Sequence, residues 1–99
     1  MAVRIVIPIV GKMGQKYDKV KLVEWKVKEG DQVSKGNAIL VLETIKASVE
    51  LEAEISGYLH ILVPAGESRI VGKVAGLIAE TEEELVQLQK TSSWELTQT

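Results

Sequence analysis

The chain has 99 residues, no cysteine and a formal net charge of −2. This length makes one small domain with one core, and the lack of cysteine excludes disulfides and thiolate metal sites. Residues 1–36 carry eight Lys and Arg against four Asp and Glu, whereas residues 37–99 carry four against ten. The basic half has neither an arginine cluster nor a row of aromatics, so we expect no nucleic-acid partner.

We expect no membrane partner either. The longest apolar runs fall short of the roughly 18 residues that a membrane-spanning helix needs. Pro8 and Arg4 interrupt the apolar start of the chain, and no small-residue cleavage site follows, so no signal peptide is expected.

Alternating apolar positions separated by turn residues predict seven or eight short strands. In chain order they are expected at residues 4–9, 20–27, 33–36, 38–43, 49–55, 58–63, 70–71 and 74–79, with a loop at 10–19 after the first. Short strands with turns every eight to twelve residues are typical of an all-β sandwich or flattened barrel.

After the last strand, Thr81 and Glu84 match a capping box at the start of a short helix, with Leu85 and Leu88 on one face. Residues 91–99 are rich in Ser, Thr and Gln and are expected to fray, with Trp94 as their only large anchor. We therefore divide the chain into a folded domain at 1–80 and a helix-like or disordered tail at 81–99.

An internal repeat supports the all-β prediction. When residues 23–44 are shifted forward by 36 positions onto residues 59–80, Gly30 falls on Gly66 and Gly36 on Gly72. The coincidence predicts two β units related by a pseudo-two-fold axis, with each glycine pair in equivalent turns of positive φ. The apolar positions expected in the core are Val27, Leu42, Val49, Leu51, Val63 and Ile78.

The remaining polar residues do not indicate a catalytic or metal site. His60 is the only histidine, and strand alternation predicts an exposed polar side chain; no nucleophile-elbow sequence accompanies it. Glu50, Glu52 and Glu54 share one face of a strand. A straight strand cannot surround Ca²⁺ with six or more oxygens, so we expect a solvated acidic face.

Lys46 has the features that a covalent attachment site requires. It joins two strong strand patterns across a few residues, and its neighbours Thr44, Ala47 and Ser48 are small enough to admit a modifying enzyme. Acylation would turn a hydrated ammonium into a neutral amide. The alternative is an unmodified, solvated turn lysine.

Residues 43–47 (Glu-Thr-Ile-Lys-Ala), with residues 23–31 upstream and 55–57 downstream, resemble the lipoyl domain of 2-oxo acid dehydrogenase acyltransferases. The resemblance covers about residues 3–80. It implies a flattened β-barrel of two four-stranded antiparallel sheets, with lipoic acid in amide linkage to Lys46 at a hairpin turn. It also implies flanking recognition residues, which would be Glu43, Thr44, Ile45 and Ala47.

The same resemblance implies a swinging-arm carrier that has no active site of its own. Its partners would be a lipoate ligase or lipoyl transferase, a 2-oxo acid decarboxylase, an acyltransferase core and dihydrolipoamide dehydrogenase. It would reside in the cytoplasm, or in the mitochondrial matrix if the domain comes from a eukaryotic chain.

Several positions depart from that family pattern. Ile45 stands where the family usually has aspartate, and an apolar residue at this position is closer to the glycine-cleavage H protein. Biotinyl domains have methionine on both sides of the lysine, and neither Ile45 nor Ala47 is methionine. Arg69 replaces an expected valine. Three alternatives therefore stay open: an aminomethyl carrier, a biotinyl carrier and an unmodified interaction module of the same fold. We expect partners to recognise Ile45 together with the basic loop at 10–19, which carries Lys12, Lys16 and Lys19.

Overall fold

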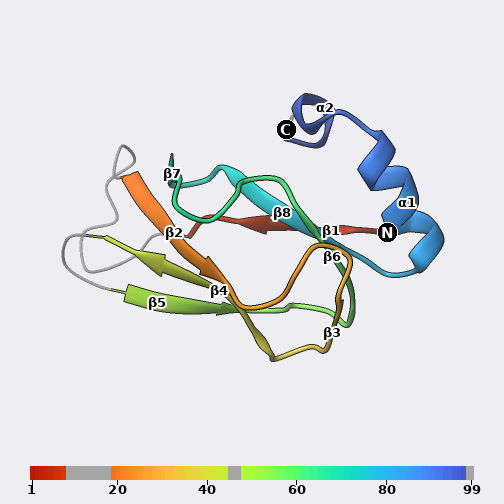
Figure 1. The fold of residues 1–99 in the computed structure, drawn as a ribbon, viewed down its shortest axis with the longest axis horizontal. Coiled ribbons are helices and arrows are strands. Elements are labelled where there is room, and N and C mark those ends of the chain that lie inside the picture. Colours follow the sequence, from red (N-terminus) through yellow and green to blue (C-terminus); the bar gives the residue numbers. More distant parts are fainter. Residues whose placement is uncertain (9–18, 45–47, 98–99) are drawn as a thin grey trace.

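The computed structural model describes residues 1–8, 19–44 and 48–97. Eight strands in these residues form two four-stranded antiparallel sheets that face each other as a flattened sandwich (Figure 1). The first sheet has the order β1 (Val3–Val6), β8 (Val74–Ala79), β6 (Gly57–Ile61) and β3 (Gln32–Val33). The second has the order β5 (Ser48–Glu52), β4 (Ala38–Glu43), β2 (Lys19–Trp25) and β7 (Ser68–Ile70). The predicted all-β sandwich is confirmed.

Some strand ends differ from the predictions for local reasons. β1 ends at Val6, because Pro8 cannot donate to a ladder. β5 ends at Glu52 instead of residue 55. The backbone of Ala53 bonds to the turn before β4 instead of to β4 itself, donating to the carbonyl of Asn37 at 2.8 Å and accepting from Gly36 at 2.9 Å. The predicted loop at 10–19 is one residue too long, since β2 begins at Lys19, and residues 9–18 lie outside the described part.

The two halves of the chain form equivalent units, as the sequence predicts. β2, β3 and β4 of one unit correspond to β6, β7 and β8 of the other, and a shift of 36 places Ala38–Glu43 on Val74–Ala79. The paired glycines have matching φ angles: 83° and 96° at Gly30 and Gly66, and 91° and 93° at Gly36 and Gly72. β1 occupies beside β8 the place that β5 occupies beside β4.

The core lies between the sheets and, among the described residues, contains no buried polar side chain. Leu42, Val63 and Ile78 are buried as predicted. Val27, Val49 and Leu51 are half-buried and pack against the core cluster from its edge. The prediction is therefore right for three positions and too strong for the other three.

Two helices follow the strands: α1 (Glu82–Lys90) and α2 (Ser93–Thr97). Thr81 Oγ1 accepts the Glu84 N–H at 3.1 Å, and the Glu84 carboxylate accepts the N–H of Glu80 at 2.8 Å. The capping pair is confirmed, with Glu84 reaching one residue further back than a capping box requires. Leu85 is buried, and Trp94 is 68% exposed, so the expected anchor is not buried. Neither helix has the length and apolar content to span a bilayer.

Candidate cofactor-attachment site

The β4–β5 hairpin positions the predicted attachment segment. The strands pair in register up to Glu43 and Ser48, so residues 44–47 alone connect two directly paired strand ends. Figure 1 places these strand ends at the opposite end of the molecule from the N terminus and α1. Ile45, Lys46 and Ala47 lie outside the described residues, so their roles stay predictions. Thr44 is half-buried and Glu43 is exposed.

The hairpin rests on a buried central strand. Ile39, Leu40 and Leu42 of β4 are completely buried, which fixes this strand in the sandwich. β5 is an edge strand with alternating exposed and half-buried residues. The Nζ of Lys26 lies 3.0 Å from the Glu50 carboxylate, and this hydrogen bond raises the pKa of Lys26. The hairpin is therefore held in the sandwich mainly by β4, an inner strand of its sheet.

The acidic face of β5 is confirmed as a solvated surface. Glu50, Glu52 and Glu54 are all exposed, and Glu50 forms an ion pair with Lys26. Within residues 1–8, 19–44 and 48–97, no group of three His, Cys, Asp or Glu side chains could hold a metal ion.

Positive charge lies on the strand beside the hairpin. Lys21 of β2 is the register partner of Glu43 on one side and of Ser68 in β7 on the other, and Lys19 is the register partner of Ile70. Neighbouring strands lie about 5 Å apart, so both lysines are close to the strand end that precedes the predicted attachment segment. Lys19 thus belongs to a strand instead of to the expected basic loop. The other two lysines of that loop, Lys12 and Lys16, lie outside the described residues.

The prediction for His60 is wrong. Its side chain is only 12% exposed, and Nδ1 lies 2.8 Å from the Glu29 carboxylate. Glu29 also accepts the Ile61 N–H at 2.6 Å and the Gln89 side-chain amide at 2.9 Å. Burial raises the pKa of Glu29, but hydrogen bonds from Gln89, Ile61 and His60 outweigh it and lower that pKa. Strand alternation missed this cluster because α1, which supplies Gln89, packs against β6.

Trp25 is a second residue whose role the sequence did not indicate. Its indole Nε1–H donates to the carbonyl of Val63 at 2.8 Å and so ties β2 of one sheet to the connection after β6 of the other. The indole also faces Gly76, where an added Cβ would lie 3.3 Å from the ring. The Trp25 side chain therefore connects the two sheets.

The chain matches an established family over most of its length. A family model described as "Biotin-requiring enzyme" (Biotin_lipoyl) matches residues 5–80. A chloroplastic relative in Arabidopsis thaliana, dihydrolipoyllysine-residue acetyltransferase component 4 of pyruvate dehydrogenase complex, is 42% identical over 66 residues, which are 66% of this chain and 14% of the relative. The corresponding acetyltransferase component of Zymomonas mobilis is 38% identical over 79 residues, 78% of this chain and 18% of the relative.

Two further proteins are similar to this chain, one in sequence and one in fold. The dihydrolipoyllysine-residue succinyltransferase component of the Bacillus subtilis 2-oxoglutarate dehydrogenase complex is 42% identical over 60 residues, 60% of this chain and 14% of the relative. A solved single-chain, multi-domain long-chain acyl-CoA carboxylase aligns with a TM-score of 0.62 over 90% of this chain and 8% of that chain. At 19% identity this likeness shows the fold alone. The chain spans less than a fifth of the length of each of these proteins.

Proposed function

The chain belongs to the biotin- and lipoyl-attachment domain family, and from this we propose that it is a carrier domain, lipoylated on Lys46, that moves acyl groups between the active sites of a 2-oxo acid dehydrogenase complex. The matched region is a small carrier domain without an active site of its own. The observation that carries the proposal is the β4–β5 hairpin, in which a lysine falls within the four residues that join directly paired strand ends.

Lipoate is proposed over biotin because the curated relatives carry dihydrolipoyllysine in their names. Attachment would form an amide between the Lys46 Nζ and the carboxyl group of lipoic acid. Once attached, lipoic acid supplies a disulfide that accepts and releases acyl groups. The chain's own part is presentation: a rigid sandwich holds the tether, and a tethered group meets its partner sites at high effective concentration.

The proposed partners are a lipoate ligase or lipoyl transferase, a 2-oxo acid decarboxylase, an acyltransferase core and dihydrolipoamide dehydrogenase. Some relatives are named as chloroplastic or mitochondrial proteins, and others come from bacteria. We place this chain in the cytoplasm, or in the mitochondrial matrix if it is part of a eukaryotic protein.

Intact mass spectrometry tests the attachment. After incubation with a lipoate ligase, ATP and lipoate, we expect one lipoyl increment that is absent from Lys46→Ala. A matched control is Lys21→Ala, because Lys21 is an exposed lysine on the neighbouring strand and the register partner of Glu43; it should keep the increment.

The same assay separates the alternatives. An increment with biotin and a biotin ligase, and none with lipoate, would identify a biotinyl carrier. No increment with either group, in a chain whose amide spectrum shows the folded state, would favour an unmodified interaction module. If the lipoylated chain is charged by a glycine decarboxylase and not by 2-oxo acid decarboxylases, the aminomethyl carrier is the correct alternative.

A further inference from the structure

The outer face of β2 carries basic and apolar side chains beside the predicted attachment segment. Lys19, Lys21 and Val23 are exposed and alternate with buried core residues, and we call these three residues the β2 surface. Since β2 and β4 are antiparallel, the start of β2 lies beside the end of β4, where Lys21 is the register partner of Glu43. α1 packs against β6 and β8 of the other sheet, so it does not cover this surface.

A β-bulge sets this part of β2 apart from its counterpart in the repeat. The pairing of β2 with β4 shifts between Leu22 and Glu24, which makes Val23 an extra residue on β2. The shift of 36 positions places Val23 on Leu59 of β6, a strand that pairs with β8 without interruption. Leu59 is completely buried, whereas Val23 is 40% exposed. Bulges redirect side chains and are frequent beside functional sites, so the β2 surface is more than a consequence of the repeat.

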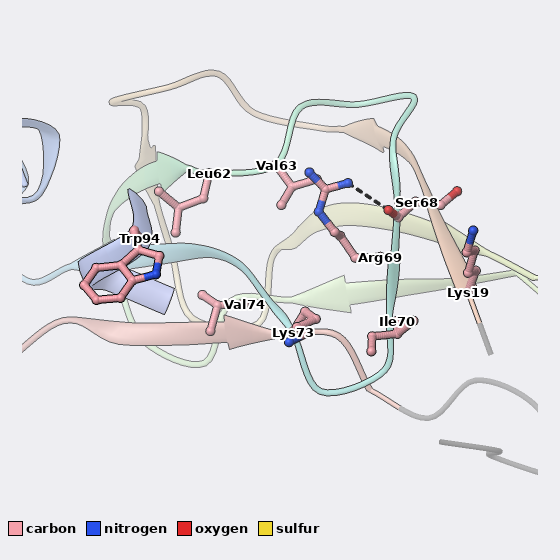
Figure 2. A pocket seen from close by; sticks show the side chains of 9 residues that line it. All are labelled: Lys19, Leu62, Val63, Ser68, Arg69, Ile70, Lys73, Val74 and Trp94. Carbon is pink, nitrogen blue, oxygen red and sulfur yellow. Dashed lines mark hydrogen bonds between the residues drawn. The ribbon is translucent and has the colours of Figure 1, made fainter. Parts of the chain in front are cut away.

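Arg69 lies near this surface but is already paired. A hollow of about 530 Å³ is lined by Lys19, Arg69 and Trp94 among other residues, and Figure 2 shows Lys19 at the end away from Trp94. The Arg69 guanidinium lies 2.7 Å from the Glu67 carboxylate. The ion pairs found between described residues include neither Lys19 nor Lys21. Within the described part of the chain, the ammonium groups of β2 are therefore open to the carboxylates of a partner.

The outer face of this sheet changes sign across its width. β5 presents the exposed side chains of Glu50 and Glu52, whereas the β2 surface carries only positive charge, and β4 lies between the two strands. Carboxylates of a partner are attracted to the β2 side and repelled from the β5 side. The asymmetry thus favours one orientation of an acidic partner relative to the hairpin.

We propose that the 2-oxo acid decarboxylase docks on the β2 surface, with carboxylates against Lys21 and Lys19 and an apolar contact against Val23. The inference rests on the proposed function and names the surface that one of its partners recognises. The lipoyl group is the same on every such domain, so an enzyme that selects one domain must bind protein surface near the tether. Dihydrolipoamide dehydrogenase only exchanges electrons with this common group, and we expect it not to depend on the β2 surface.

Steady-state acylation of the lipoylated chain tests the proposal. The probes are the pyruvate decarboxylase component of the Zymomonas mobilis complex and the 2-oxoglutarate decarboxylase component of the Bacillus subtilis complex, because acyltransferase components of both complexes are relatives of this chain. Each turnover releases CO₂, reduces the lipoyl disulfide and leaves the acyl group on one sulfur and a proton on the other, which intact mass records. Lys21→Glu should raise the KM for the chain at least about fivefold and change kcat less than about twofold, because docking and not chemistry is impaired. Lys21→Arg keeps the charge and should stay within about twofold of the wild type.

The matched control is Lys35→Glu, the same charge change at an exposed residue of the turn before β4. The six residues of β4 separate that turn from Glu43 by about 20 Å, so the KM should not change. Val23→Ser should raise the KM about twofold or more through loss of an apolar contact. Raising NaCl from about 20 to 200 mM should lower kcat/KM of the wild type more than that of Lys21→Glu. Every lipoylated variant should be reduced by dihydrolipoamide dehydrogenase and NADH at the wild-type rate.

Three results would overturn the inference and leave the proposed function intact. The first is an equal KM for Lys21→Glu and Lys35→Glu. The second is a loss with Lys21→Arg as large as that with Lys21→Glu, since the charge would then not be what the enzyme recognises. The third is an equal loss of rate with dihydrolipoamide dehydrogenase. Absence of a lipoyl increment on the wild type, or of acylation by both decarboxylases, would instead reject the proposed function, and the inference with it.

Discussion

Some glycines of this chain are required for lack of space and others for their backbone conformation, and substitution by alanine distinguishes the two. A Cβ on Gly57 would overlap the carbonyl oxygen of Ala79 on the neighbouring strand, whereas a Cβ on Gly66 would meet nothing within 4 Å. The requirement at Gly57 is space between β6 and β8. The requirement at Gly66 is its φ of 96°, which disfavours side chains with a Cβ.

Gly57→Ala should therefore cost more stability than Gly66→Ala. We expect a loss of about 3 kcal/mol or more for Gly57→Ala, because two strands of a packed sheet must separate. Gly66→Ala should lose about 1–2 kcal/mol from backbone strain alone. Urea unfolding at pH 7 measures both. Equal losses would contradict the close approach of β6 and β8.

The Glu29 carboxylate should make stability depend on pH. Its pKa is lowered from 4.5 in the folded chain, so its contribution is present above that value and is lost as the pH falls through the folded pKa. The free energy of unfolding of Glu29→Gln should lie below that of the wild type at pH 7, with the gap closing as the pH falls below 4.5. Since the side chain is 40% exposed, the gap should not exceed about 1 kcal/mol.

Denaturant titrations at pH 7, 5 and 3 measure this dependence, with Glu83→Gln as an exposed acidic control on α1. A gap that stays constant over this range would mean that the hydrogen bonds to Ile61 and Gln89 act without the charge.

At the level of elements, α1 extends the folded unit beyond the family match. Leu85 is 8% exposed, the Gln89 amide donates to Glu29 at 2.9 Å, and the Tyr58 hydroxyl donates to Glu82 at 3.4 Å. The division at residue 80 was a prediction from the sequence. These contacts lead us to propose that the stable unit runs through α1 and that the tail begins after Lys90.

Leu85→Ala tests this boundary. If α1 is part of the folded unit, loss of a buried leucine should lower the free energy of unfolding by about 2 kcal/mol or more. Val86→Ala, at the next position but 44% exposed, should change it by less than about 0.5 kcal/mol. A Leu85→Ala effect as small as that of Val86→Ala would mean that α1 is only loosely docked, and the division at residue 80 would stand.

The local sequence pattern was enough to predict those elements whose signal lies within a few residues. The turn glycines, the bounds of β8 and the capping residues Thr81 and Glu84 follow from spacing and side-chain chemistry. His60 did not follow, because its partner Glu29 lies 31 residues earlier and the helix that packs against β6 comes more than twenty residues later. The order of the strands, with β1 beside β8, has no local signal in the sequence, and the family resemblance implied only two four-stranded sheets.

The candidate site shows the same division. Pairing of Glu43 with Ser48 agrees with the hairpin that the two strand patterns predicted around Lys46. The hollow that Lys19, Arg69 and Trp94 help to line could not be predicted, because these residues are widely separated in the sequence. Arg69 did stand out as a departure from the family pattern, but nothing in the sequence indicated that it lines the same hollow as Trp94.

On the scale of the whole molecule, the pseudo-two-fold arrangement is achieved with unequal connections. β4 and β5 are joined by residues 44–47, whereas their counterparts β8 and β1 are the last and the first of the described strands. The first sheet is therefore completed by a contact between the beginning of the chain and its last strand, with Val3 the register partner of Ile78.

That pairing has a consequence for synthesis. During synthesis β1 leaves the ribosome before the other strands of this domain, and it has no partner until β8 has followed. Val3 and its register partner Ile78 are 75 residues apart. The β4–β5 hairpin needs only its own few residues and can form much earlier, because closing a short loop costs less entropy than closing a long one. We expect the hairpin that contains Lys46 to form early, and the N-terminal strand to be the last to dock.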